Sequence, residues 1–196
     1  MKPLMLSILL LAQVAGKAQQ PNYIDSLKKF QLDYVHTHEV VKKTDWKYFR
    51  FFPVNKKYRV LATFEKIDDP KGFIMKTSGD KTRRYFKYGT VSFMIDKKSL
   101  QLTVYQSEDL MRSSQYKNYL FIPFTDLTSG DKSYGGGKYL DFLMDDIKNN
   151  TLLIDFNKAY NPYCAYTTGY NCPIPPAEND LPIAINAGEM SFGKSH

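Results

Sequence analysis

Cysteine, histidine and tryptophan are scarce in this chain of 196 residues, which contains two cysteines, three histidines and one tryptophan. The cysteines form no CxxC pair and no histidine lies near them, so the clustered ligands of a zinc site are missing and we expect no bound metal. A catalytic cysteine would need a neighbouring base. The histidines, His36, His38 and His196, lie elsewhere in the sequence.

The glycine patterns that hold phosphates are also missing. There is no GxxxxGKS/T motif, and no GxGxxG follows a predicted strand into a helix. The run Gly135-Gly136-Gly137 therefore predicts a tight turn or a close approach of backbone to a ligand. We expect no cofactor. The formal charge of +7 is spread over lysine pairs along the chain, which argues against a nucleic-acid partner.

No apolar run approaches the ~20 residues that span a bilayer as a helix. The most apolar stretch, residues 3–14, follows Met1-Lys2 and precedes the small residues of 15–18. This is the layout of a secretory signal. We predict a signal peptide at 1–18, a periplasmic or secreted protein without a membrane anchor after cleavage, and a single domain over 19–196 with its core at about 25–194.

Aromatic residues are abundant, with 15 tyrosines and 13 phenylalanines, and such residues favour strands. Alternating patterns predict strands at 58–64, 72–77, 84–95, 100–105, 120–122, 152–156 and 181–185, and Gly89 predicts a bulge. A 3.6-residue period predicts one helix over 22–43. No alternation of strands and helices follows, so the predicted fold class is mainly β (α+β): an antiparallel β-barrel or sandwich with an N-terminal helix and two long ordered loops.

The two predicted loops, 125–139 and 157–180, exceed the usual loop length and are rich in tyrosine. We interpret them as the functional surface, which binds a small molecule or saccharide. Candidate ligand-binding residues are Asp126, Tyr134, Asp155, Asn157, Tyr160, Asn161 and Glu178. Because two cysteines in an exported protein most simply pair, we expect a Cys164–Cys172 disulfide.

Two other functions are consistent with the same residues. One is a hydrolase that uses paired carboxylates from Asp126, Asp155 and Glu178. The other is a structural or envelope-interaction protein without a ligand. The acids also have an ordinary scaffolding use, because carboxylates that follow strands commonly accept hydrogen bonds from loop amides.

Several long motifs resemble the bacterial and archaeal family called domain of unknown function 1684. They read TRRYFKYGTVSF, LFIPFTDLTSGDKSYGGGKYL, IDFNKAYNPYCAY and CPIPPAENDLPIAINAGE. The resemblance extends over roughly residues 25 to 194 and implies a folded unit without an established activity. The chain departs from the usual Glu-Thr-Tyr-Gly-Gly-Gly-Arg-Tyr of that family, with Lys132-Ser133 for Glu-Thr and Lys138 for Arg. Lysine lacks the planar fork of arginine, so a bidentate anion clamp at position 138 would be lost.

Overall fold

The structure is a computed structural model that describes residues 22–194. The predicted signal peptide, residues 1–18, lies outside the described residues. Within 22–194, no helix is both long and apolar enough to cross a bilayer.

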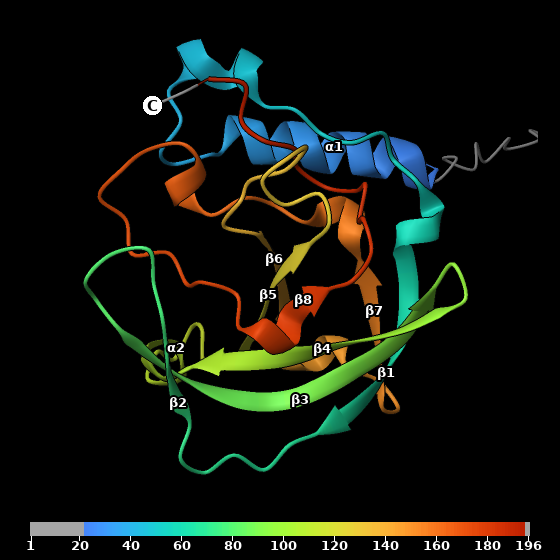
Figure 1. Cartoon of the computed structure of the whole chain (residues 1–196), viewed down its shortest axis with the longest axis vertical. Helices are drawn as coiled ribbons and strands as arrows, with labels where there is room; N and C mark the ends of the chain where they lie inside the picture. Colours follow the sequence, from blue (N-terminus) through green and yellow to red (C-terminus); the bar gives the residue numbers. More distant parts are fainter. Residues whose placement is uncertain (1–21, 195–196) are drawn as a thin grey trace, which may run out of the picture.

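One curled sheet organises the molecule (Figure 1). Its strands run in the order β6-β5-β4-β3-β1-β7, with β2 added to β3 and β8 added to β5. All pairs are antiparallel except the short β5–β8 pair. The strands are β1 (Arg59–Lys66), β2 (Phe73–Met75), β3 (Arg83–Ile95), β4 (Lys98–Ser107), β5 (Tyr119–Asp126), β6 (Lys138–Leu143), β7 (Thr151–Asp155) and β8 (Asp180–Leu181). This half-barrel confirms the predicted antiparallel β architecture.

The predicted N-terminal helix is present but shorter than expected. Helix α1 (Tyr23–His36) begins where the Asn22 side chain accepts the backbone N–H of Asp25 at 3.0 Å, the usual N-cap arrangement. It ends before the predicted residue 43 because His38 Nδ1 accepts the Val41 N–H at 3.2 Å, a local bond that competes with helix continuation. In Figure 1, α1 lies across the molecule on the side opposite β3 and β4.

The remaining helices are short, with three to six residues each. They are η1 (Lys43–Tyr48), η2 (Lys56–Tyr58), α2 (Glu108–Met111), η3 (Met144–Asp146), η4 (Phe156–Lys158), η5 (Tyr163–Ala165) and η6 (Ala177–Asn179). Three of them, η4, η5 and η6, lie in the second predicted loop, which is therefore ordered by short helical turns.

The β3–β4 hairpin has a tight turn and the expected bulge. Asp96 and Lys97 take φ angles of 50° and 63°, as a two-residue turn that matches strand twist requires. The β3–β4 register shifts between Lys87 and Gly89. A Cβ atom on Gly89 would lie 2.5 Å from the carbonyl oxygen of Glu65, so the bulge position accepts only glycine.

Three strands, β6, β5 and β8, differ from what the sequence predicts. Strand β6 was not predicted, because its polar residues Lys138 and Asp141 hide the alternation. Strand β5 continues past Pro123, which pairs in register with Tyr139 of β6. The predicted strand 181–185 is reduced to β8, since Pro182 has no N–H to donate to a ladder.

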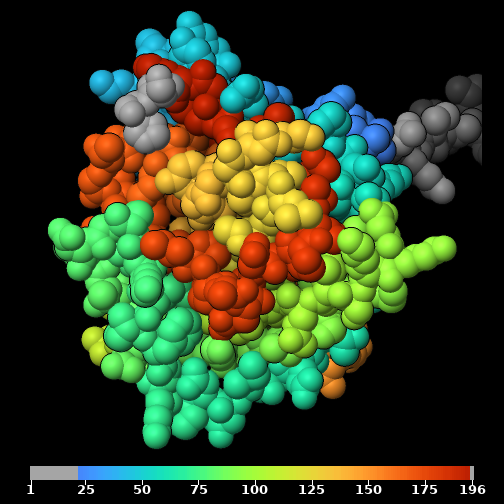
Figure 2. Space-filling model, in the orientation of Figure 1, coloured from blue at the N-terminus to red at the C-terminus, as the bar shows by residue number. Residues whose placement is uncertain are grey.

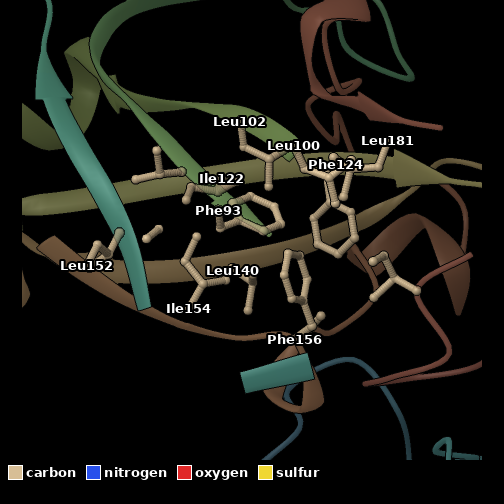
Figure 3. Packing of buried hydrophobic residues seen from close by; sticks show 14 of the residues in the cluster. Phe93, Leu100, Leu102, Ile122, Phe124, Leu140, Leu152, Ile154, Phe156 and Leu181 are labelled. Carbon is tan, nitrogen blue, oxygen red and sulfur yellow. The ribbon is translucent and has the colours of Figure 1, made fainter. Parts of the chain in front are cut away.

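Apolar side chains pack on both faces of the sheet. The main core fills the concave side and includes Phe93, Phe124, Ile154 and Phe156 (Figure 3). On the other face, Met75, Tyr85, Tyr105, Phe121 and Tyr139 form a second buried cluster. Residues that alternate along β3 to β6 therefore supply both layers, and the second layer is rich in tyrosine.

Candidate functional site

The second cluster opens into a hollow of about 450 Å³, which we call the tyrosine pocket. Five tyrosines from three separate stretches of the chain reach it. The lining residues are Lys81, Arg83, Tyr85, Tyr139, Tyr160, Pro162, Tyr163, Gly169, Tyr170, Asn171, Cys172 and Pro173.

The inner wall of the tyrosine pocket is held by the sheet. Tyr85 of β3 and Tyr139 of β6 are both buried, each 6% exposed. Tyr160 is joined to the edge of β6 because its N–H and C=O both bond to the backbone of Tyr139, at 3.1 and 2.8 Å. The Tyr160 hydroxyl donates to Asp141 Oδ2 at 2.5 Å. The ring positions are therefore fixed by backbone pairing as well as by packing.

The outer wall is the loop closed by the Cys164–Cys172 disulfide, which confirms the predicted pairing. This loop docks on the segment before β3, where the Ser78 N–H donates to the carbonyl of Cys172 at 2.9 Å. In Figure 2 the orange disulfide loop borders the green segment on the left of the view. The ring of Tyr170 in this loop and the ring of Tyr163, just before it, meet edge to face at 5.2 Å.

Most hydroxyl protons of the pocket tyrosines are already used in hydrogen bonds. Besides Tyr160, the Tyr139 hydroxyl donates to the carbonyl of Pro173 and the Tyr163 hydroxyl to Glu39 Oε2 at 2.9 Å. Burial is the main cause that raises the pKa of Tyr139 and Tyr160, and burial with the bond to Glu39 raises the pKa of Tyr163 to about 12. The rings therefore present apolar faces and acceptor oxygens.

The charged residues of the tyrosine pocket are basic. Arg83 and Lys81 line it, and no aspartate or glutamate is among the lining residues. The guanidinium of Arg83 lies 3.6 Å from Asp109 Oδ2, and both side chains are exposed, at 44% and 61%. Such an exposed ion pair contributes little to stability, so Arg83 can readily leave Asp109 to bind solvent or a ligand.

Of the predicted ligand-binding residues, Tyr160 is the one that lines this pocket. Tyr134 belongs to a different cluster, where it packs with Val41, Ala165 and Tyr166. The two predicted loops thus touch each other, since Tyr134 comes from the first and Tyr166 from the second.

Asp155 and Asn157 join α1 and the β1 entry to the end of β7. Asp155 accepts the Tyr23 hydroxyl at 2.9 and 3.0 Å through its two oxygens, and it accepts the Asn157 N–H at 3.1 Å. Asn157 donates to the carbonyl of Asn55 at 3.0 Å and accepts its N–H at 2.9 Å. Both residues are buried, as expected for side chains that satisfy loop backbone groups.

Asp126 lies in the core beside Lys138, with 3.1 Å between Lys138 Nζ and Asp126 Oδ2 and no exposed side-chain surface on either residue. Lys138 also donates to the carbonyls of Ile185 and Ala187 at 3.1 and 3.3 Å. Burial lowers the pKa of Lys138, and Asp126 opposes that shift. The Lys138 departure from the family pattern therefore keeps a cation at a core position, whereas Lys132 lies on the surface.

Asn161 takes part in a buried network around Glu189. Glu189 has no exposed surface and accepts the Tyr166 hydroxyl at 2.7 and 2.8 Å, the Asn161 N–H at 2.9 Å and the Tyr34 hydroxyl at 3.3 Å. Burial raises the pKa of Glu189 to about 7 although these donors oppose the shift. The network ties α1, the disulfide loop and the C-terminal segment together.

Glu178 differs from the other two predicted acids because its side chain is 40% exposed. It contacts Lys87 at 2.8 Å and accepts the Tyr105 hydroxyl at 3.0 Å. Asp126, Asp155 and Glu178 thus each serve a separate set of partners.

A second hollow, of about 580 Å³, lies between the two free edges of the sheet. We call it the seam hollow. Asp141 and Phe142 of β6 and Leu153 and Asp155 of β7 line it, under α1. Asp141 reaches solvent there, but the protein crowded around its carboxylate raises its pKa, against the bonds from Tyr119 and Tyr160.

Sequence reasoning missed Arg83, Lys81 and Tyr85 as site residues. The alternation of β3 places Arg83 and Tyr85 on one face, which was a usable signal. His38, which follows α1, packs on Tyr34 and Tyr166, with ring centroids at 5.3 and 4.5 Å. Burial lowers its pKa to about 4. Within residues 22–194, no cluster of three metal-ligating side chains occurs.

The chain was compared with known proteins. A search of the curated proteins gave no match. Among solved structures, the chain is similar to the uncharacterized protein from gene locus rrnAC0354 of Haloarcula marismortui, determined by solution NMR. That similarity has 31% sequence identity and a TM-score of 0.64, and it covers 84% of this chain and 92% of the other. The family described as protein of unknown function (DUF1684) matches residues 44–190. The chain belongs to this family.

Proposed function

We propose that this protein is exported and binds a small ring-shaped molecule, a saccharide or an aromatic compound, in the tyrosine pocket. The observation that carries the proposal is the convergence of five tyrosines on one hollow of about 450 Å³. Pockets of this size hold small ligands and are usually lined by aromatic side chains with a few polar groups.

The pocket is built before any ligand arrives. Tyr139 and Tyr160 are fixed by mutual backbone bonds, and the disulfide closes the loop that carries Tyr170 and begins next to Tyr163. A rigid pocket loses little conformational entropy on binding. Tyr170 is 41% exposed and therefore offers a ring at the mouth on which a ligand can stack.

Export is supported by two independent features. The N-terminal layout of residues 1–18 is that of a signal peptide, and disulfides persist mainly in oxidising compartments. The mass of the intact protein recovered outside the cytoplasm tests this part: it should correspond to a chain that begins near residue 19. Recovery of the full chain from the cytoplasm alone would contradict export.

Ligand binding is tested with the wild type and with Tyr170→Ala. Thermal-shift and calorimetric screens should include neutral and charged monosaccharides, short oligosaccharides and small aromatic compounds. A ligand of the tyrosine pocket should bind the wild type and lose about ten- to a hundredfold in affinity to Tyr170→Ala, the effect of one lost stacking partner. Tyr116→Ala is a matched control, since Tyr116 is similarly exposed at 46% and does not line the pocket.

A further inference from the structure

We infer that the ligand of the tyrosine pocket carries an anionic group, a carboxylate, sulfate or phosphate, which Arg83 binds. This inference rests on the proposed function, and it adds the chemical class of the ligand. It follows from the donors that the pocket leaves available.

The hydroxyl protons of three pocket tyrosines are already committed. Tyr139 donates to a carbonyl, Tyr160 to a carboxylate and Tyr163 to a carboxylate. A hydroxyl has one proton, so these groups can only accept from a ligand. A neutral polyol needs both donors and acceptors around it, and these three hydroxyls supply acceptors alone.

The strong donors that remain are cationic. Arg83 offers a planar guanidinium whose N–H groups match a carboxylate or sulfate in pairs. Its contact with Asp109 is long, at 3.6 Å, and solvent-exposed, so an incoming anion can take its place. Lys81 stands beside it, held by the bond from its backbone N–H to Asn171 Oδ1 at 2.9 Å.

The wall that the sheet supplies beside these cations is apolar. Tyr85 and Tyr139 are buried, and Tyr139 packs edge to face on Phe121 with ring centroids at 4.8 Å. A ligand that fits has a ring for the tyrosine faces and a negative charge directed at Arg83. Of the carboxylates near the pocket, Glu39 and Asp141 accept tyrosine hydroxyls, and Asp109 pairs with Arg83.

The test uses matched pairs of probes in which a carboxylate replaces a hydroxymethyl group. Methyl glucuronide is compared with methyl glucoside, and 4-hydroxybenzoate with 4-hydroxybenzyl alcohol, by calorimetry on the mature protein. In at least one pair the anion should bind about ten- to a hundredfold more tightly, the range for a charge-assisted hydrogen bond. The pair that responds tells a saccharide ligand from an aromatic one.

Two variants test whether Arg83 causes the preference for the anionic probe. Arg83→Gln should remove the preference for the anion and leave the affinity for the neutral partner within about twofold. Lys97→Gln removes a charge at the far end of β3 and should leave both affinities unchanged. Equal affinity for both members of each pair, or a preference that survives Arg83→Gln, would overturn the inference while the pocket still binds. If no probe binds the wild type, or if Tyr170→Ala changes nothing, the proposed function fails and the inference with it.

Discussion

Lys138 shows how a single residue can be required for the fold while it contributes nothing to the surface. Its ammonium has three donors, and the structure offers three acceptors within reach: Asp126 and the carbonyls of Ile185 and Ala187. The rings of Phe52 and Phe124 lie 5.4 and 5.7 Å from Nζ. A lysine at this depth is tolerated because its ammonium donates to two carbonyls and lies against the carboxylate of Asp126.

Lys138→Met should therefore lower the free energy of unfolding by about 3–5 kcal/mol, since it leaves the buried Asp126 without a counter-charge. Urea denaturation at pH 7 measures the change. Lys87→Met is the control: the exposed Lys87–Glu178 pair should contribute no more than about 1 kcal/mol. Adding Asp126→Asn to Lys138→Met should recover part of the lost stability. If the double variant instead loses the sum of the two single losses, Lys138 and Asp126 do not interact.

Glu189 and His38 should give the protein two opposing dependences on pH. Burial raises the pKa of Glu189 from 4.5 to about 7, so the folded state holds a proton that the unfolded chain releases in this window. The free energy of unfolding then falls as pH rises, by about 3 kcal/mol in total. Burial lowers the pKa of His38 from 6.5 to about 4. The contribution of His38 to the free energy of unfolding therefore rises with pH over that range.

Glu189→Gln removes the titration of Glu189 and leaves that of His38. The free energy of unfolding should then increase between about pH 4 and 6.5. His38→Asn keeps an acceptor for the Val41 N–H and should expose the opposite slope, a loss of stability toward pH 7. Urea midpoints at half-unit intervals of pH give both profiles. Profiles parallel to that of the wild type would contradict the assignment.

Among the elements, the disulfide loop should contribute stability by restricting the unfolded chain. A cross-link between residues eight apart is expected to stabilise by about 2–3 kcal/mol in the chain-entropy treatment. The double variant Cys164→Ser/Cys172→Ser should lose that amount in urea denaturation. The wild type in reducing buffer serves as the control and should lose a similar amount. Equal stability of oxidised and reduced protein would contradict the prediction.

The elements that sequence predicts well are those whose pattern is local. Helix α1, the β3–β4 hairpin and the Gly89 bulge depend on periodicity and on backbone geometry within a few residues. Strand β6 escaped prediction because Lys138 enters the core as a charged residue and Asp141 faces the seam hollow. Lys138 is explained by its ion pair with Asp126, and Asp141 by the hydrogen bond that it accepts from Tyr160. Neither partner can be read from the sequence of the strand itself.

The tyrosine pocket was predictable only in part. The tyrosine-rich second loop contributes Tyr160, Tyr163 and Tyr170, as expected of a functional loop. Arg83 comes from a strand about 80 residues earlier in the chain. A single sequence carries no signal that this strand and the second loop line the same pocket. Sequence identified Asp126 and Asp155 as acids next to loops. It could not predict their contacts, because their partners, such as Lys138 and Tyr23, lie elsewhere in the chain.

At the scale of the whole molecule, stability should be uneven. Helix α1 buries one residue, Leu27, and its hydroxyl bonds to the rest of the protein come from Tyr23 and Tyr34. Strand β4 buries seven of its ten residues. Regions with little buried surface open before the core does, so α1 should exchange its amide hydrogens at a lower free energy than β4.

Tyr34→Phe should lower the opening free energy of α1 by about 1 kcal/mol, the net value of a hydrogen bond, and leave β4 unchanged. Hydrogen exchange read by mass spectrometry resolves the two elements. Lys29→Ala, which removes the exposed Lys29–Asp33 pair of the same helix, is the control and should change α1 by about 0.5 kcal/mol or less. Equal protection of α1 and β4 would show that the molecule opens as a single unit.

The strand order also has a consequence for how the chain folds. From β3 to β6 each strand pairs with the next along the chain, so this part can assemble as a series of hairpins. Strand β7 instead returns to β1, where Arg59 pairs with Asp155 across more than 90 residues of sequence. Closing so long a loop costs entropy that few early contacts repay. We therefore expect β1–β7 pairing to be the final, rate-limiting step of folding, and the seam hollow to form only then.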